Sequence, residues 1–420
     1  MEKIFSAIPF YYGATEKAPN TERVMVEMND RVDGALFTEA VKQAMRRYPY
    51  FCVRVCSDGR EFTLEDNDAE VVVKETACPV SLGGTEANGH LLAFSWWEDS
   101  IYLDMFHGLS DGGGLFPLLR TVLYYYCREK YDGALSPEGI RLAGEDIPRE
   151  EIDEPYPRSV DEGIRPVGKA QRKAALNLSA AGLCHPGKPT MYCIRIPEDA
   201  YMKYSKDKDG SPAVMTVLFM AKAIDSIHRD SGLPIICGMA MNTRKALGRP
   251  LSHHSLVSQL FLEYKQHMRH MDTRDQATCF RGMVMVQGQD ENVMDSVRNN
   301  IRLFERMDAL PDIADRQKMM QQVVSSFLDV DTFKVSYVGK SGMGASEKYI
   351  KSIYSSVDLN GSGIMIEVNS VNGEFCLSFL QEWEESVYVD AFLKQLEQEG
   401  IPYTLARREA LRVASVEIGG

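Results

Sequence analysis

The chain has 420 residues, of which 44% are hydrophobic and 25% are charged, a composition typical of a folded globular protein rather than a disordered one. Its length predicts two or three structural units of roughly 100–200 residues each. With 47 Lys and Arg against 60 Asp and Glu, the formal net charge is −13, which argues against general nucleic-acid binding because such binding depends on basic side chains that neutralise phosphates.

The first half of the sequence alternates predicted strands with a few helices. Residues 23–29 alternate apolar and polar side chains, which predicts a strand with one buried face. Apolar residues at helical spacing between Phe37 and Tyr48 predict a helix that ends at Pro49. The other candidates before residue 130 are strands at 51–55, 62–64 and 71–74, a hairpin at 91–96 and 101–106, and an apolar helix at 115–127.

An acidic stretch that contains prolines, residues 145–162, changes the composition and predicts a crossover between two units. After it, Ser211 and Pro212 are residue types that begin helices, and the apolar run behind them predicts a deeply buried helix. The dipeptide Asn372-Gly373 is a strong hairpin signal. The other candidates are strands at 191–196, 234–241, 255–264, 332–338, 363–369 and 374–380, and helices near 291–308, 312–328 and 389–396.

Both halves mix a few long helices with antiparallel strands, which predicts the α+β class with two lobes of similar size. We place the first lobe at residues 1–175, with the acidic crossover at about 145–190, and the second lobe at 190–420. No apolar stretch approaches the roughly 18–20 residues of a membrane span, and the first residues lack a signal-peptide pattern. The nine cysteines are scattered without a CxxC pair, which is typical of reduced thiols in a cytoplasmic protein.

The most informative segment is F-H-G-L-S-D-G-G-G at residues 106–114, which a predicted strand enters and a predicted helix leaves. Loops held between rigid elements often carry function. One interpretation is a glycine-rich turn with a hydrogen-bonded histidine and no catalytic role. A second is the nucleophile elbow of a serine hydrolase, because residues 108–112 match G-x-S-x-G with Ser110 as nucleophile. That fold needs a later histidine, and His270, the last in the chain, lies far from its end.

The third interpretation is the motif H-x-x-x-D-G, with His107 as a general base and Asp111 as a structural anchor. In this form the segment resembles the active-site motif of the CoA-dependent acyltransferase superfamily, which includes chloramphenicol acetyltransferase, alcohol acetyltransferases and the condensation domains of nonribosomal peptide synthetases. Three more segments resemble landmarks of that family in the family's order. They are the early helix-then-strand segment at residues 40–55, the polar turn Asn242-Thr243-Arg244, and the S-N-x-G-like segment at residues 335–339.

The resemblance implies two chloramphenicol-acetyltransferase-like lobes, each a mixed sheet with flanking helices, around an active-site tunnel. It also implies acyl transfer from a thioester to an alcohol or amine. A thioester is already activated, so the reaction needs a base rather than an enzyme nucleophile, and imidazole side chains in general titrate near pH 6.5. By resemblance His107 is that base, Asp111 pairs with an arginine that holds the loop, and Gly112 lets the backbone approach the substrate.

The resemblance further implies that Ser336, Tyr337 and Gly339 contact the acyl donor, and it makes Arg54 the first candidate for the partner of Asp111. We expect acyl-CoA as a co-substrate, with no permanently bound cofactor and no metal. The expected partners are a small-molecule donor and acceptor, with a carrier protein less expected than CoA, and the chain is expected to be a monomer. Basic residues number 20 against 30 acidic ones before residue 176 and 27 against 30 after it, so the second lobe is the better place for residues that meet CoA phosphates, with Lys340 and Lys348 as candidates.

Some residues depart from the family pattern. Phe106 stands where condensation domains have the first of two adjacent histidines, which favours a stand-alone acyltransferase over a condensation domain. Tyr337 stands where the alcohol acetyltransferases often have Asn. A lobe pair that only binds thioesters or carrier proteins is the alternative without catalysis. The histidines at positions 253, 254, 267 and 270 lack accompanying ligands and are better explained as surface or hydrogen-bonded residues than as a metal cluster.

Overall fold

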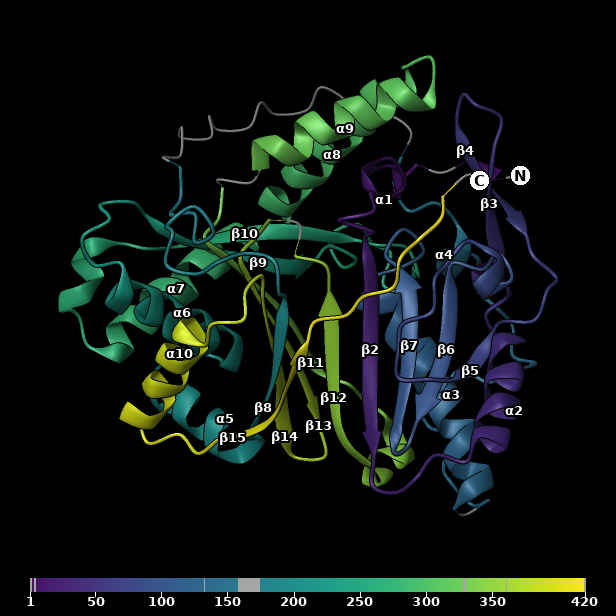
Figure 1. Cartoon of the computed structure of the whole chain (residues 1–420), viewed down its shortest axis with the longest axis horizontal. Coiled ribbons are helices and arrows are strands. Elements are labelled where there is room, and N and C mark those ends of the chain that lie inside the picture. Colours follow the sequence, from purple (N-terminus) through teal and green to yellow (C-terminus); the bar gives the residue numbers. More distant parts are fainter. Residues whose placement is uncertain are drawn as a thin grey trace.

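In the computed structural model, which describes residues 2–3, 5–131, 133–157, 174–327, 330–359 and 361–418, the chain folds into two lobes side by side (Figure 1). The first lobe contains a five-stranded sheet in the order β12-β2-β7-β6-β5, and the second a seven-stranded sheet in the order β10-β9-β11-β13-β14-β8-β15. Both sheets mix parallel and antiparallel pairs. The prediction of two mixed-sheet lobes is confirmed.

The first lobe places helices against its five-stranded sheet. The strands are β2 (Thr21–Met28), β5 (Val73–Glu75), β6 (Leu92–Trp97), β7 (Ser100–Phe106) and β12 (Ile350–Val357). A small separate sheet consists of β1 (Glu2–Lys3), β3 (Val53–Ser57) and β4 (Phe62–Asp66). Helix α2 (Gly34–Met45) begins at Asp33, whose side chain accepts hydrogen bonds from two backbone N–H groups, and packs beside α3 (Gly112–Lys130). The central strands β2 and β7 are buried along their whole length.

The second lobe carries its helices on the outer face of the seven-stranded sheet, away from the first lobe (Figure 1). Its strands are β8 (Thr190–Pro197), β9 (Ile235–Asn242), β10 (Val257–Tyr264), β11 (Phe333–Lys340), β13 (Ile364–Val371), β14 (Glu374–Gln381) and β15 (Thr404–Ala410). Its helices are α5 (Glu198–Asp207), α6 (Pro212–Ile227), α7 (Thr273–Gln287) and α10 (Val387–Gln398). Helix α6 is capped by Ser211 and is buried almost all round, as its apolar sequence predicts.

Two segments from the end of the chain return to the first lobe. Strand β12 follows β11 in sequence but pairs with β2, where it extends the sheet of the first lobe. After β15, the Thr21 hydroxyl donates to the carbonyl of Ala414 at 2.6 Å, and Val416 forms a bridge with Leu82. The expected boundary at residue 190 therefore does not separate the two lobes cleanly. The acidic crossover contains a short helix, α4 (Arg149–Ile152). Its residues 158–173 lie outside the described residues.

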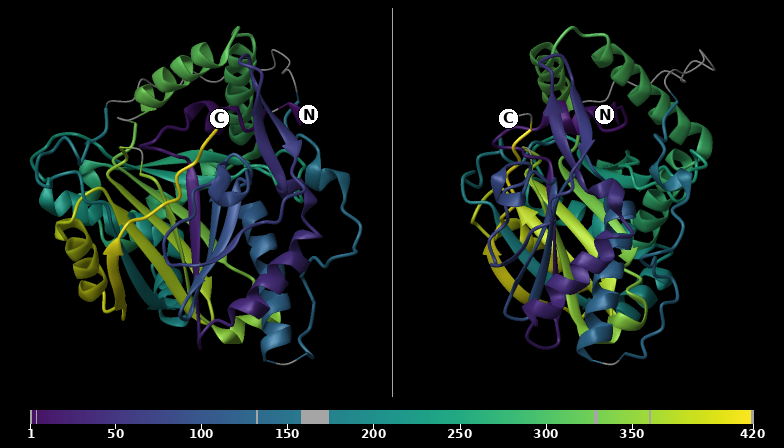
Figure 2. Two further views of the ribbon diagram at one scale, coloured as in Figure 1. Left: turned by 45° about the vertical axis from the view of Figure 1, so that its right-hand side comes forward. Right: turned by 90° about the vertical axis from the view of Figure 1, so that its right-hand side faces the viewer.

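A helical hairpin lies over one end of both lobes (Figures 1 and 2). It consists of α8 (Asp290–Asp308) and α9 (Ile313–Phe327), which bear out the helices predicted at 291–308 and 312–328, and it contacts α1 (Ile8–Gly13). Phe304 and Met307 of α8 are buried in the core of the first lobe. The hairpin therefore joins the second half of the chain to the first lobe. Among the described residues, no helix has both the length and the apolar character that crossing a membrane requires.

Candidate active site

The H-x-x-x-D-G segment lies at the junction of the lobes, between the end of β7 at Phe106 and the start of α3 at Gly112. The Phe106 ring is fully buried and meets Tyr11 edge to face, with the ring centroids 4.9 Å apart. The backbone N–H of Leu109 donates to the carbonyl of Phe106, which closes a tight turn. Strand β7 and helix α3 thus hold both ends of the segment in rigid structure.

His107 is half-buried, and its backbone N–H donates to the carbonyl of Asn20 at 2.8 Å. Its ring stacks on Phe10, with the ring centroids 4.8 Å apart and the planes 7° from parallel. The ring Nδ1 is buried and has no hydrogen-bond partner among the described residues. Asp358 lies close to His107. Burial raises the pKa of the Asp358 carboxyl, whereas backbone hydrogen bonds from Asn20 and Thr21 and the charge of His107 lower it in part. Stacking and the backbone therefore fix the position of the imidazole.

Asp111 is buried and fully engaged in holding the loop. One of its carboxylate oxygens caps α3 by accepting from the N–H of Gly113 at 2.8 Å, and the other accepts from the N–H of Leu256 at 2.8 Å. Arg244 donates to both oxygens through its two terminal nitrogens, and its Nε donates to the carbonyl of Ser252 at 2.9 Å. Asp111 thus ties the loop of the first lobe to two segments of the second.

Arg54 is not the partner of Asp111, and that prediction was wrong. Arg54 lies on β3 in the small separate sheet, where its exposed side chain pairs with Glu65 at 3.2 Å. The partner is instead Arg244, which belongs to the Asn242-Thr243-Arg244 turn after β9. The reason for the error is that β3 belongs to the small separate sheet and not to the sheet of β7, and its Arg54 side chain is exposed there.

Two of the three glycines after Asp111, at positions 113 and 114, stand where neighbouring atoms leave no room for a side chain. A Cβ atom on Gly113 would lie 2.4 Å from Nη1 of Arg244, and one on Gly114 would lie 2.4 Å from the carbonyl oxygen of His253. A Cβ atom on Gly112 would make only ordinary contacts, with Phe116 at 3.6 Å and Val338 at 3.7 Å. The close approach of Arg244 and His253 therefore excludes side chains at two positions. At Gly112, which faces Val338 of β11, these contacts do not exclude a Cβ atom.

Ser110 is buried, and its hydroxyl donates to the carbonyl of His253 at 2.6 Å. A nucleophilic serine needs its hydroxyl beside the ring nitrogen of a histidine. In the described part of the chain, Oγ of Ser110 meets backbone carbonyls and no imidazole. This geometry does not support the hydrolase interpretation.

The segment predicted to meet the donor, on β11, runs beside this loop. Ser336 and Val338 are half-buried on the side that faces the first lobe, where Val338 approaches Gly112 and the Ser336 hydroxyl bonds to the carboxyl of Glu367. The Tyr337 ring instead lies 6.3 Å from that of Phe375 in the core of the second lobe. A bulge separates Tyr337 from Gly339, which has a φ of +76°. Of the three predicted residues, Ser336 directs its side chain to the site and Tyr337 directs its side chain away.

Two buried glutamates border the same junction. Glu22 on β2 pairs with Met105, two residues before His107, and Glu367 on β13 pairs with Ser336. Burial raises the pKa of Glu22 to about 8, with further contributions from the charges of Glu367 and Asp111. Burial also raises the pKa of Glu367 to about 7, although the hydrogen bond from Ser336 acts to lower it. Sequence analysis missed both residues, although an acid inside an apolar strand, as in I-M-I-E-V, was a usable signal.

A cavity of about 360 Å³ lies between α1, the helical hairpin and the first residues of β10 and β11. Phe10 both lines this cavity and stacks on the His107 ring. The hairpin contributes an apolar wall of Leu303, Phe304, Met320, Val323 and Val324. Asp331 and Lys334 lie at a polar end, where Nζ of Lys334 donates to Ser362 at 2.7 Å. The cavity therefore suits a ligand with an apolar body.

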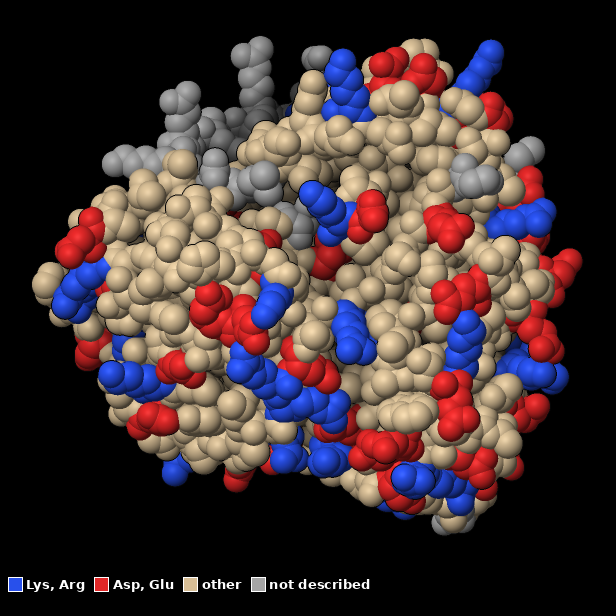
Figure 3. Space-filling view, viewed as in Figure 1, with Lys and Arg blue, Asp and Glu red and all other residues tan. Residues whose placement is uncertain are grey.

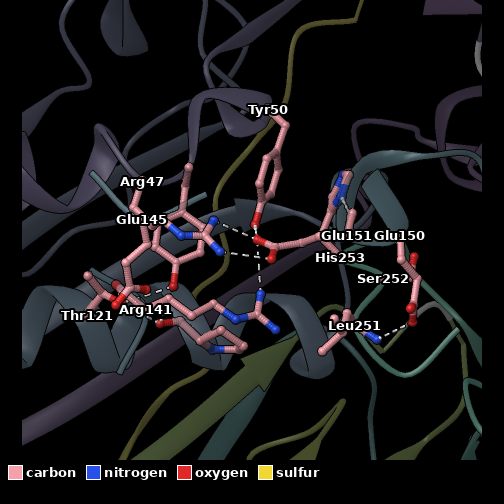
Figure 4. A network of polar contacts seen from close by, with 12 residues as sticks. Arg47, Tyr50, Thr121, Arg141, Glu145, Glu150, Glu151, Leu251, Ser252 and His253 are labelled. Carbon is pink, nitrogen blue, oxygen red and sulfur yellow. Dashed lines mark hydrogen bonds and ion pairs between the residues drawn. The ribbon is translucent and has the colours of Figure 1, made fainter. Parts of the chain in front are cut away.

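A buried ionic network on α4 supports the loop (Figure 4). The carboxylate of Glu151 accepts from both terminal nitrogens of Arg47, at 2.9 and 3.0 Å, and from the Tyr50 hydroxyl. Arg141 adds a third cationic contact at 3.1 Å. The Glu151 carbonyl accepts from the N–H and Nδ1 of His253, whose own carbonyl holds Ser110. His253 thus has a structural position, and no group of three or more ligand-type residues in the described ranges could hold a metal ion.

Comparison with known proteins identifies the fold. No family model and no curated protein matches the sequence. The structure is similar to that of TRI101 from F. sporotrichioides complexed with coenzyme A and T-2, with 12% identity, a TM-score of 0.58, and coverage of 93% of this chain and 97% of that one. It is also similar to polyketide synthase associated protein 5 from Mycobacterium tuberculosis, with 12% identity, a TM-score of 0.58, and coverage of 94% and 97%. For the epimerization domain from the third module of tyrocidine synthetase B, identity is 11%, the TM-score 0.61, and coverage 95% and 96%.

Proposed function

We propose that the protein transfers an acyl group from a CoA thioester to a nucleophilic acceptor, with His107 as the general base. The observation that carries this proposal is the position of the His107 ring, which stacks on Phe10, a residue that lines a cavity between the lobes. The fold supports it, because this chain shares the CoA-dependent acyltransferase and condensation-domain fold with TRI101, whose structures include complexes with coenzyme A.

The reaction needs little covalent chemistry from the protein. His107 removes a proton from the acceptor as its oxygen or nitrogen attacks the thioester carbonyl, and then returns a proton to the departing thiolate. General-base catalysis of this kind typically contributes about 10²–10⁴-fold. Positioning of the two substrates supplies much of the remaining acceleration. Asp111 and Arg244 serve this step by holding the loop rather than by touching a substrate.

The acyl donor lies between β11 and the loop in this proposal. Val338 of β11 approaches Gly112 of the loop, and Ser336 precedes it by two residues on the strand, whereas the Tyr337 ring lies near that of Phe375. Of the two lysines suggested for the CoA phosphates, Lys340 is exposed with Glu198 at 3.6 Å, and Lys348 lies over the ring of Tyr349. Lys and Arg gather more densely on the front surface where the lobes meet, although acidic residues are interspersed there (Figure 3).

A comparison of two alanine variants tests the proposal. His107→Ala should lose nearly all transfer from acetyl-CoA and octanoyl-CoA to a panel of alcohols and amines, measured as free thiol release and by mass spectrometry of the product. Ser110→Ala should keep a sizeable fraction, and His185→Ala, at an exposed histidine outside the site, should match the unmodified protein. A covalent acyl adduct on Ser110, or an active His107→Ala protein, would falsify the assignment. Thioester binding without turnover by any acceptor would instead support the alternative of a non-catalytic binding protein.

A further inference from the structure

Glu22 and Glu367 come from strands of opposite lobes, and each strand pairs with one that carries part of the candidate active site. Glu22 lies on β2 between β7 and β12, in register with Met105 and Val357. Glu367 lies on β13 beside Ser336, and Val338, two residues further along β11, contacts the position of Gly112. Their exposed fractions are 7% and 4%. Each carboxyl group thus lies one strand from a segment that forms the site.

Neither glutamate has a cationic partner in the part of the chain that the structure describes. The groups whose charges act on Glu22 are Glu367 and Asp111, and Asp111 is already paired with Arg244. Arg23, the next residue on β2, pairs with Asp104 at 2.7 Å. Glu367 accepts a hydrogen bond from the Ser336 hydroxyl, which is a neutral group. A buried carboxylate without a partner is costly, so a protein keeps such a pair where a proton or a ligand cation compensates it.

Whether a proton or a ligand cation compensates the two carboxylates depends on the chemistry of the acceptor. An alcohol loses one proton when it attacks a thioester, and His107 alone can carry that proton to the thiolate. A primary amine enters near neutral pH as an ammonium ion and loses two protons before an amide is formed. Acylation of an amine therefore needs a second proton acceptor besides the base, and an anionic environment that attracts the ammonium ion.

We propose that the acceptor is a primary amine with an apolar body, and that Glu22 and Glu367 bind its ammonium group beside His107. This inference rests on the proposed function. The ammonium ion transfers one proton to the carboxylate pair, and the neutral amine nitrogen attacks the thioester carbonyl to form the C–N bond. His107 takes the second proton from nitrogen, the C–S bond breaks, and His107 protonates the thiolate. The products are an amide, CoA with a free thiol and one proton, which leaves the carboxyl pair for solvent.

Matched acceptors and isosteric variants test this inference. With acetyl-CoA at pH 7, 2-phenylethylamine should be preferred to 2-phenylethanol, and hexylamine to hexanol. Glu22→Gln and Glu367→Gln should each lower kcat/KM for the amines by about a hundredfold, because a buried cation loses its counter-charge, with most of the change in KM. The loss should shrink toward pH 9.5, where neutral amine becomes available. Glu374→Gln, at a half-buried glutamate on the neighbouring strand β14, is the matched control.

Binding provides a readout that does not depend on turnover. Calorimetric titration of the whole protein with 2-phenylethylamine, in two buffers of different ionisation enthalpy, should show proton release, and both Gln variants should weaken binding. Efficient acylation of alcohols with no acylation of amines would overturn this inference while the proposed function stands. If no acceptor is acylated at all, the proposed function fails, and the titration alone decides whether the carboxyl pair binds amines. An absence of amine binding overturns the inference in either case.

Discussion

At the scale of single residues, the ion pair between Asp111 and Arg244 is the contact on which the site geometry depends most. Both side chains are almost fully buried, and together they bridge the two lobes. Removal of one partner from a buried pair typically costs about 3–5 kcal/mol, because the other charge remains buried. We therefore expect Asp111→Asn and Arg244→Met each to lower the free energy of unfolding by about that amount, and to lower activity.

Urea unfolding of the two single variants and the double variant measures this coupling. The double variant should be less destabilised than the sum of the two single variants, since it leaves no unpaired charge. Strictly additive losses would contradict a direct pair.

The same scale shows what sequence reasoning can establish about the site. Short motifs specify residue type and spacing, and they therefore predict His107, Asp111 and Ser336 as site residues. The same reasoning predicts Arg54 as the partner of Asp111, because Arg54 lies near a family landmark. Arg244 lies 133 residues from Asp111, and only the packing of β9 beside the loop brings them together. Local patterns carry no information about which distant residue completes a buried pair.

The buried glutamates predict a pH dependence of stability. The folded state raises the pKa of Glu22 to about 8, above the value of about 4.3 for a glutamate in an unfolded chain. The folded state therefore binds this proton more tightly, and the resulting stability is present at low pH and lost as the pH rises through the folded value. We expect the free energy of unfolding of the unmodified protein to fall between pH 5 and pH 8 relative to that of Glu22→Gln. Parallel pH profiles of the two proteins in urea unfolding would contradict the burial of an unpaired Glu22.

At the scale of elements, the strand β12 shows where pattern analysis fails. Its sequence, I-K-S-I-Y-S-S-V, has too many serines to indicate a buried strand. The serines are buried because they have specific partners: the Ser352 hydroxyl bonds to Glu27, and that of Ser355 accepts from Asn369 at 3.2 Å. Strand β15 also lacks an apolar pattern, because it lies at the edge of the sheet and its residues are mostly exposed. By contrast, α6 and the helices of the hairpin follow their apolar spacing closely.

The short helix α4 has an importance that its length does not suggest. Glu151→Gln removes the charge that compensates Arg47, so we expect a loss of about 3–5 kcal/mol in the free energy of unfolding. Activity should also fall, because the Glu151 backbone positions His253, which holds Ser110. Asp153→Asn, in an exposed pair with Arg149 on the same segment, should change stability by no more than about 1 kcal/mol. Thermal and urea unfolding of both variants check this, and equal effects would show that the network does not support the loop.

At the scale of the whole molecule, the sequence predicts two lobes correctly but not how the chain is divided between them. The second half supplies β12, the helical hairpin and the final segment to the first lobe. Apolar spacing identifies a helix and its buried face, but it does not say which core that face enters. This exchange of elements is what encloses the site. Phe10 of the first half lines the cavity together with the hairpin, and both lie over the junction that holds His107.

The charge of the whole chain bears on the choice of donor. The net charge is −13, and carrier proteins are commonly acidic, so like charges oppose the docking of a carrier domain. Lys340 already faces Glu198, and Lys348 lies over the ring of Tyr349, so we expect contacts with the CoA nucleotide to contribute less than contacts with pantetheine. We expect turnover with acetyl-CoA, slower but measurable turnover with acetyl-pantetheine, and little with an acetylated carrier protein.

The lysine variants Lys340→Ala and Lys348→Ala should raise the KM for acetyl-CoA no more than about fivefold, since exposed ion pairs contribute about 0–1 kcal/mol. Turnover with the carrier protein alone would overturn the assignment of CoA as donor. Faster turnover with acetyl-pantetheine than with acetyl-CoA would show that the site does not recognise the nucleotide phosphates.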